Sequence, residues 1–298
     1  MDANEPVVPS SEPVVLSSEL LGFSADARIL IVNCDDFGMS PAINTAVIDA
    51  IEQGIGGSCS LMVSCPAAPQ AMDLLRRRPE ISFGVHLTLV RDTADHRWGP
   101  RRARTDVPSL LDEAGELFTP TPAGRAALLA QARLDEVERE FRAQIDAVAD
   151  AGLTPAHLDF HCLADGGRDD IFDLTMALAE EYGLAVRVWL AHGRAKARGR
   201  GLPVVDHEFL DSFSLDIEGK AARYAGMLAA LPAGLSEWAV HPGRDDDESR
   251  ATDPGWRVRS TDREFLTSPE AREILDREGI VVIDHRAVQR AWHRPGRP

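Results

Sequence analysis

The chain has 298 residues, of which 44% are hydrophobic and 27% charged, a composition typical of a soluble globular protein. The formal net charge of −16 argues against a nucleic-acid backbone or an anionic membrane surface as the main partner. No apolar run approaches the roughly 18 residues that a membrane helix needs, and the acidic N-terminus does not resemble a signal peptide. None of the four cysteines forms a CxxC pair, so we expect free thiols in a cytoplasmic protein.

Residues 1–26 contain Pro, Ser and Glu without a hydrophobic period, which predicts a disordered or loosely attached N-terminal arm. The apolar run at 27–33 predicts a strand that is buried on both faces. Ser40 and Pro41 then suit the N-cap and first position of a helix. We therefore expect Asp35-Asp36 on the short loop between this strand and this helix.

Strand and helix patterns alternate along the rest of the chain. Further strands are predicted at 58–64, 81–90, 154–163, 184–190, 203–209, 235–243 and 280–284. Further helices are predicted at 66–78, about 123–150, 169–183, 217–234, 268–279 and 285–292. Loops are expected at 192–203, at 244–262 and at 91–122, the last as an insertion over one end of the fold. This alternation predicts a parallel α/β sheet with right-handed crossovers in a single domain over 27–298, either closed as a barrel or open.

Polar residues occur where the predicted strands end, which is where sites gather in parallel α/β folds. Asp35-Asp36 could supply one metal ligand and one base, or form an Asx turn or helix cap. His86 is a metal ligand or a hydrogen-bonded core histidine. His241, before Pro-Gly, could protonate a leaving group or simply belong to a turn. Glu237 could orient another group or pair with an arginine.

The run HLDFH places His157, Asp159 and His161 on one face of a predicted strand. At about 3.3 Å per residue, residues 157 and 161 lie about 13 Å apart, so His161, nearer the C-terminal end, is the better ligand. Asp159 or His157 could then orient a ligand imidazole, or all three could form a polar group inside the barrel. One carboxylate with two imidazoles suits Zn²⁺ or another divalent first-row ion, or Mg²⁺ with retained waters.

Longer segments around these residues resemble the YdjC/ChbG-like carbohydrate deacetylases. In family order across about 28–243, the matching segments are LIVNCDDFGMSPAINTAVIDAIEQG, SCSLMVSCPAAPQA, FGVHLTL, TPAHLDFHCLADG and SEWAVHPG. The resemblance implies a deformed (β/α) barrel of the NodB-like polysaccharide deacetylase type. It also implies a divalent-metal-dependent hydrolase that releases acetate from an N-acetylated amino sugar, oligosaccharide or glycoconjugate. By resemblance, Asp36, His86 and His161 bind the metal, Asp35 is the base, and His241 is the general acid or oxyanion partner.

The sequence departs from the family pattern directly after HLDFH. Family members often carry further histidines there, and this chain has Cys162, Leu163 and Ala164. The three implied metal ligands are retained, but the familiar chitooligosaccharide substrate is not carried over.

The expected partners are a sugar or glycoconjugate and one divalent ion, with Mg²⁺ and Zn²⁺ as first candidates, and the sequence leaves a homodimer open. Alternatives are another metal-dependent amidase or phosphoesterase on the same scaffold, or a non-catalytic sugar-binding homologue. Arginines of the 91–122 insertion could line the substrate cleft or belong to a solvated loop: Arg97, Arg101, Arg102 and Arg104.

Overall fold

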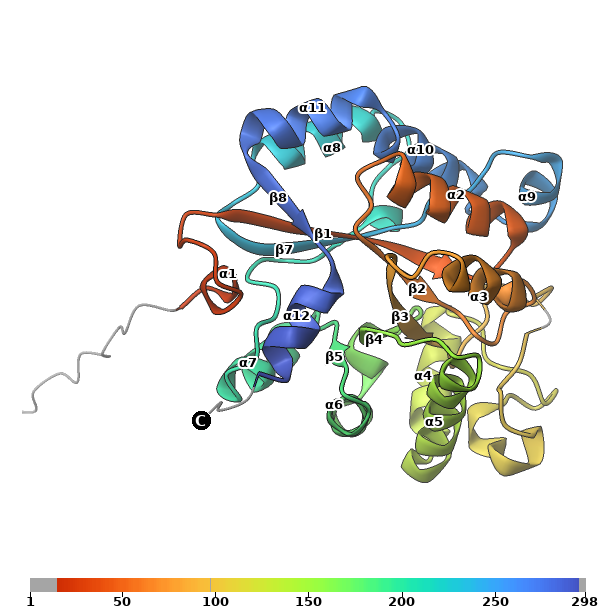
Figure 1. Cartoon of the computed structure of the whole chain (residues 1–298). Helices are drawn as coiled ribbons and strands as arrows, with labels where there is room; N and C mark the ends of the chain where they lie inside the picture. The colour runs from red at the N-terminus through yellow and green to blue at the C-terminus, as the bar shows by residue number, and fades with distance from the viewer. Residues whose placement is uncertain (1–14, 97, 295–298) are drawn as a thin grey trace, which may run out of the picture.

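The computed structural model describes residues 15–96 and 98–294. Its eight strands form one sheet in which the paired strands run parallel, in the order β5-β4-β3-β2-β1-β7-β6, with β8 also paired to β1 (Figure 1). The predicted parallel α/β architecture is confirmed as a curved, incompletely closed barrel, because β5 and β6 are the two ends of the strand order. The strands are β1 Arg28–Phe37, β2 Ser58–Leu61, β3 Ser82–Leu87, β4 His157–Phe160, β5 Ala185–Val186, β6 Leu210–Asp211, β7 Gly234–Val240 and β8 Ile280–Ile283.

Strand β1 is the centre of the sheet. It pairs with β7 on one side, while on the other side β8 takes its first residues and β2 its last ones. Nine of its ten residues are buried, because helices cover one face and the barrel interior the other. This position explains the continuous apolar run that predicted a strand buried on both faces.

Helices surround the sheet, and α8, α10 and α11 lie together along one side of it (Figure 1). Ser40 and Pro41 begin α2 as predicted, and the Ser40 hydroxyl accepts a hydrogen bond from the Ile43 amide at 3.2 Å. The helices are α1 Ser17–Leu20, α2 Pro41–Glu52, α3 Ala68–Arg76, α4 Pro122–Gln131, α5 Leu134–Asp150, α6 Asp169–Tyr182, α7 Ala191–Gly199, α8 Lys220–Ala229, α9 Asp247–Thr252, α10 Trp256–Leu266, α11 Pro269–Glu278 and α12 His285–Trp292. None of the helices in the described ranges is long and apolar enough to cross a membrane.

The helix predicted over about 123–150 is two helices, α4 and α5, with extended backbone at Ala132 and Arg133 between them. Tertiary partners satisfy the backbone groups at this break. The Arg133 amide donates to the Ser109 hydroxyl, and the Arg168 guanidinium donates to the carbonyls of Leu129 and Ala132. Contacts from distant segments therefore interrupt a pattern that is locally continuous.

Two expected loops contain helices, and one expected strand is displaced. Helix α7 occupies most of 192–203, and α9 and α10 occupy most of 244–262. The strand predicted at 203–209 is wrong, and its place in the sheet is taken by β6 at Leu210–Asp211. The 91–122 insertion is irregular as predicted, with short 3₁₀ turns η1 Arg104–Asp106 and η2 Pro108–Leu110.

Part of the expected N-terminal arm is a docked element. Residues 1–14 lie outside the described residues, whereas α1 packs with Ser17 and Ser18 buried. The Ser17 amide donates to the Asp206 carboxylate at 3.0 Å, and the Ser17 hydroxyl accepts from the Val204 amide at 3.1 Å. Packing in the described chain therefore begins before residue 27, and the single domain over 27–298 stays a prediction.

His157 lies inside the barrel, away from the cavity described below. It begins β4 beside Gly84 of β3, and its ring stacks on His285 with centroids 3.6 Å apart. A Cβ atom at Gly84 would lie 2.4 Å from the ring, so only glycine leaves room for this imidazole. Burial, aided by the neighbouring His285, lowers the pKa of His157 to about 4.

This lowered pKa predicts a pH-dependent loss of stability. Between about pH 6.5 and 4 the unfolded chain binds a proton at this position that the folded chain does not, so the free energy of unfolding falls as the pH falls. At the acid end of this window, His157 lowers the free energy of unfolding by about 3 kcal/mol. Urea unfolding at several pH values should show that the free energy of unfolding falls less steeply with falling pH in His157→Gln than in the wild type. An equal pH dependence in the two proteins would contradict the lowered pKa of His157.

Candidate metal centre

Asp35 and Asp36 lie within the last three residues of β1, just before Phe37, and the prediction that they lie on a loop is wrong. Successive side chains of a regular strand point to opposite faces, yet both carboxylates line one cavity. Asp36 has φ +65°, and the β1–β2 register shifts between Cys34 and Phe37. This irregularity turns two consecutive acids toward the same space, as β-bulges beside active sites do.

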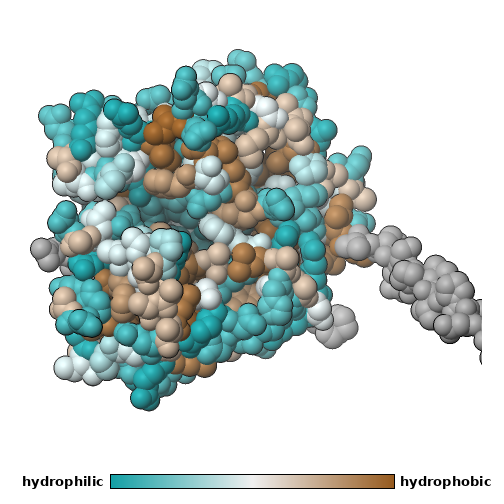
Figure 2. All heavy atoms as spheres, turned by 180° about the vertical axis from the view of Figure 1, so that it is seen from behind, coloured by the Kyte–Doolittle hydropathy of each residue, from teal (hydrophilic) through white to brown (hydrophobic). Residues whose placement is uncertain are grey.

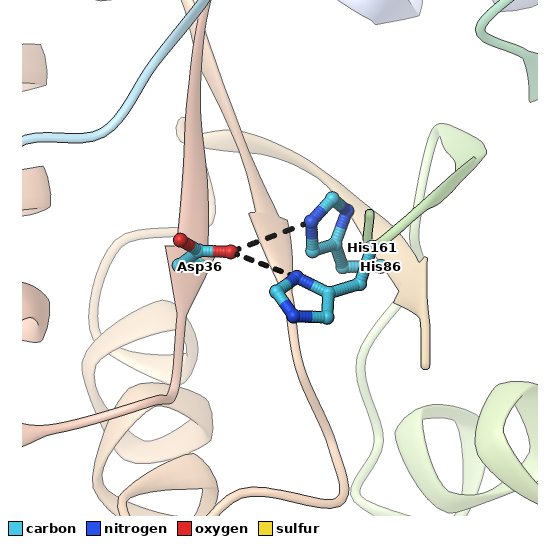
Figure 3. A group of neighbouring side chains, drawn as sticks. All are labelled: Asp36, His86 and His161. Carbon is cyan, nitrogen blue, oxygen red and sulfur yellow. Dashed lines mark ion pairs between the residues drawn. The ribbon is translucent and has the colours of Figure 1, made fainter. Parts of the chain in front are cut away.

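Asp36, His86 and His161 come together at the C-terminal ends of β1, β3 and β4 (Figure 3). The Asp36 Oδ1 atom lies 3.5 Å from His86 Nε2 and 3.2 Å from His161 Nδ1. This oxygen is buried and has no hydrogen-bond partner within the described residues. Metal bonds of about 2.0–2.2 Å place ligand atoms about 3.0–3.5 Å apart, so the three residues fit one divalent cation.

A second carboxylate orients each imidazole. His86 Nδ1 lies 2.8 Å from Asp159, which is its direct partner in the β3–β4 register, and His161 Nε2 lies 2.6 Å from Asp92. The nitrogens left for a cation are therefore the two that face Asp36, an arrangement typical of metal-binding histidines. Asp92 was not among the predicted site residues, although it lies close after the strand that carries His86.

Arg187 forms the centre of the buried charge network beneath the cavity. Its two terminal nitrogens each lie 2.8 Å from an oxygen of Asp35, one of them also lies 2.9 Å from Asp159, and its Nε lies 2.8 Å from Glu237. Glu237 also lies 3.3 Å from His285, so it pairs inside the barrel and does not line the cavity. Arg187 was not among the predicted site residues, and its only signal in the sequence is a cation within the apolar run LAVRVWL.

Arg259 reaches the centre from α10, in a segment that was expected to be a loop. Its Nη2 lies 2.8 Å from Asp36 Oδ2, and its Nε lies 2.8 Å from Asp253. The guanidinium thus occupies one oxygen of Asp36, and the other oxygen faces the imidazoles. No sequence motif marks this arginine.

The electrostatics of the centre favour a cation. Burial raises the pKa of Asp36, but Arg259 and the imidazoles outweigh it and hold that pKa well below its ordinary value. Burial likewise raises the pKa of Asp35, and Arg187 outweighs it, so this pKa is also lowered. Burial lowers the pKa of His86, but Asp159 and the carboxylates nearby raise it to about 10. The same negative potential that favours a proton on His86 also stabilises a divalent ion.

The cluster lies on the floor of a cavity of about 650 Å³. Figure 2 shows a hollow with a hydrophilic interior, bordered by hydrophobic residues. His241 also lines the cavity, with Nε2 4.0 Å from Asp35 and Nδ1 2.8 Å from the Ser212 hydroxyl. Trp189 and Phe213 contribute apolar wall.

The insertion arginines that the structure describes do not line this cavity. Arg102 and Arg104 pair with acids of their own segment, Asp106 and Glu116. Arg101 is absent from the cavity lining, and Arg97 lies outside the described residues. These contacts favour the solvated-loop interpretation.

The fold and the centre define a class: a parallel α/β barrel with one carboxylate and two imidazoles at the C-terminal ends of its strands, beside a further acid and a further histidine. The family model of the YdjC-like proteins matches residues 29–277, and the chain belongs to this family.

Relatives and a solved structure agree with this family. A carbohydrate deacetylase of Geobacillus stearothermophilus is 30% identical over 87% of this chain and 97% of its own length. A carbohydrate deacetylase of Thermoanaerobacter pseudethanolicus is 28% identical over 87% of this chain and 98% of its own. A crystal structure from Enterococcus faecalis V583, provisionally described as a cellobiose-phosphate cleavage protein, matches with TM-score 0.75 and 27% identity over 88% of this chain and 99% of its own.

Removal of Arg187 should strongly destabilise the fold. Arg187→Met leaves three carboxylates in the barrel without their cation, and breaking a buried ion pair typically costs about 3–5 kcal/mol. The more exposed Arg142, which pairs with Glu138 and Glu181, provides the control, because such pairs contribute less than about 1 kcal/mol. Urea unfolding of Arg187→Met and Arg142→Met measures both. Similar losses in the two variants would contradict the role of Arg187.

Asp92 should affect metal affinity through His161. Asp92→Asn weakens the contact that orients this imidazole, and loss of such a partner typically lowers metal affinity about 10- to 100-fold. Asp95→Asn, an exposed change in the same segment, should bind as the wild type does. Calorimetric titration of chelator-treated proteins with Zn²⁺ gives the affinities. Equal affinity for Asp92→Asn and Asp95→Asn would rule out this role of Asp92.

Proposed function

We propose that this protein is a metal-dependent carbohydrate deacetylase that removes the acetyl group from an N-acetylated amino sugar, oligosaccharide or glycoconjugate and releases acetate. The observation that carries the proposal is a three-ligand centre on a cavity floor with Asp35 and His241 beside it. The curated relatives named carbohydrate deacetylases support the substrate class. Cytoplasmic location, and a free sugar or glycoconjugate as the partner, remain part of the proposal.

Asp36, His86 and His161 would hold the divalent ion, with Zn²⁺ and Mg²⁺ as the first ions to test. Such an ion, when bound, polarises an amide carbonyl and lowers the pKa of a bound water. The chain fixes the geometry of the three ligands through Asp159, Asp92 and Arg259, each of which contacts one of them.

Asp35 is the group placed to accept a proton from the attacking water. Arg187 and Asn33 hold its carboxylate, which lines the cavity, and the lowered pKa keeps it ionised. A carboxylate has about four lone-pair sites, so these bonds leave room to accept a further proton. Arg187 therefore positions the base, and the two act as a unit.

His241 is the group placed to donate a proton to the leaving amine. The Ser212 hydroxyl contacts Nδ1, and Asp262 accepts a hydrogen bond from the His241 backbone amide at 2.8 Å. These contacts fix the ring with Nε2 on the side of Asp35. Proton transfer to the nitrogen of the tetrahedral intermediate releases acetate and a free amino sugar.

Metal-stripped protein should release acetate from N-acetylated sugars only after Zn²⁺, Mg²⁺, Mn²⁺ or Co²⁺ is restored. The panel should include oligosaccharides, glycoconjugates and, as controls for another hydrolase, phosphate monoesters and simple amides. Phosphate release, or cleavage of the simple amides alone, would replace the proposal with a phosphoesterase or another amidase. Absence of any turnover in the metal-loaded protein would favour a sugar-binding homologue.

Substitutions of Asp35 and Asp36 should affect turnover and metal content differently. Asp35→Asn should keep the ion and lose about 10²- to 10⁴-fold in kcat, as expected for loss of a general base. Asp36→Asn should lose the ion as well as the activity. Metal content by mass spectrometry and kcat by acetate release decide the matter. Near wild-type kcat in Asp35→Asn would remove Asp35 as the base.

A further inference from the structure

The outer face of His161 carries a second group of metal-binding atoms. His161 Nε2, the nitrogen turned away from Asp36, lies 2.6 Å from Asp92 Oδ1 and 3.5 Å from Cys162 Sγ. One ligand atom from each of these three residues lies within 4.8 Å of the others. All three residues line the cavity, and Cys162 is exposed, so the group is accessible from solvent.

We propose that Cys162, His161 and Asp92 form a second cation site, which takes thiophilic divalent ions such as Cd²⁺ or excess Zn²⁺ and inhibits the enzyme. The inhibitory part of this inference rests on the proposed function. A thiolate, an imidazole nitrogen and a carboxylate are a ligand set that soft and borderline ions prefer, whereas Mg²⁺ prefers oxygen ligands. The centre at Asp36 contains no sulfur ligand, so the two positions differ in ion preference.

Inhibition follows because the two positions share one imidazole. A neutral imidazole has one nitrogen that accepts and one that carries hydrogen. A cation on Nε2 therefore places the hydrogen on Nδ1, the atom 3.2 Å from Asp36 Oδ1. The first centre then loses His161 as a ligand, so binding at the two positions is competitive.

The surrounding charges are compatible with a cation at this position. Asp92 Oδ2 lies 3.9 Å from Arg259, while Oδ1 faces His161, so the two oxygens of this carboxylate serve different partners. Arg259 is itself held by Asp36 and Asp253, which offset its charge.

The first test is spectroscopic and independent of turnover. Cd²⁺ titrated into chelator-treated wild type should produce an ultraviolet thiolate-to-cadmium charge-transfer band that saturates near one equivalent. Cys162→Ala should lack the band and bind Cd²⁺ at least about tenfold more weakly at this position. Cys65→Ala is the matched control, because Cys65 is buried and contacts Met62, and it should retain the band. No band in the wild type, or an unchanged band in Cys162→Ala, would overturn the proposal.

The second test measures competition between the two positions. Cd²⁺ added to Co²⁺-loaded wild type should change the visible cobalt spectrum and, with an active substrate, abolish acetate release. Cys162→Ala should need at least about tenfold more Cd²⁺ for either effect. Equal sensitivity of the two proteins would refute the shared-ligand inhibition. A protein that shows the band and the cobalt change but never releases acetate would instead refute only the proposed function.

Discussion

The buried guanidinium of Arg187 connects β4 with β1 and β7, although β3 and β2 stand between them in the strand order. It follows β5 at one end of the strand order and contacts Asp35 of β1, Asp159 of β4 and Glu237 of β7. Placing three carboxylates inside a barrel is costly unless a cation and good hydrogen bonds accompany them. Arg187 supplies both, with contacts of 2.8–2.9 Å. The same side chain therefore stabilises the incompletely closed barrel and holds the acids beside the cavity.

The acids around the cavity differ in the partners that hold them. Asp35 is held by Arg187 and Asn33, Asp36 by Arg259, and Asp159 and Asp92 each hold an imidazole. These contacts fix the orientation of each carboxylate. In Asp36 they leave the Oδ1 atom unpaired, because it faces both histidines and bonds to neither.

Three non-glycine residues with positive φ lie in the described part of the chain: Asp36 and Cys162 line the cavity, and Asp165 lines a smaller pocket beside it. Such backbone conformations cost energy and persist where the surroundings enforce them. At Asp36 the result is a second acid on the cavity floor. At Asp165 the carboxylate accepts the amides of Trp189 and Leu190 and thereby fixes the aromatic wall.

His161 has a different environment on each face of its ring. One nitrogen faces Asp36 and the other faces Asp92 and Cys162. The thiol directly follows the HLDFH run and lies 3.5 Å from the outer nitrogen of the ring. The two faces of one imidazole therefore offer different sets of neighbouring ligand atoms, and only the outer set contains sulfur.

Much of the fold and part of the centre could be predicted from the sequence. Alternating apolar strands and capped helices indicate a parallel sheet because burial on both faces requires continuous apolar runs, as in β1. The spacing of HLDFH favoured His161 over His157 as the ligand, and the structure places His157 in the barrel interior. Polar residues at the strand ends marked Asp35, Asp36, His86 and His161 as candidates, because strand ends meet at one edge of a parallel sheet, and the family resemblance implied which three of them are the ligands.

Only the tertiary structure decided the contacts that cross the barrel. Arg187 lies at a strand end, Asp92 in the insertion and Arg259 on a helix. No common motif connects them, and their partners lie far away in the sequence. The irregularity at Asp36 and the break between α4 and α5 also depend on neighbouring segments, which local patterns do not encode. The sequence by itself determined which residues are apolar, which are charged and where the strands end. The tertiary structure decided which charges meet, because the energy of a buried charge depends on partners that only folding brings within about 3 Å.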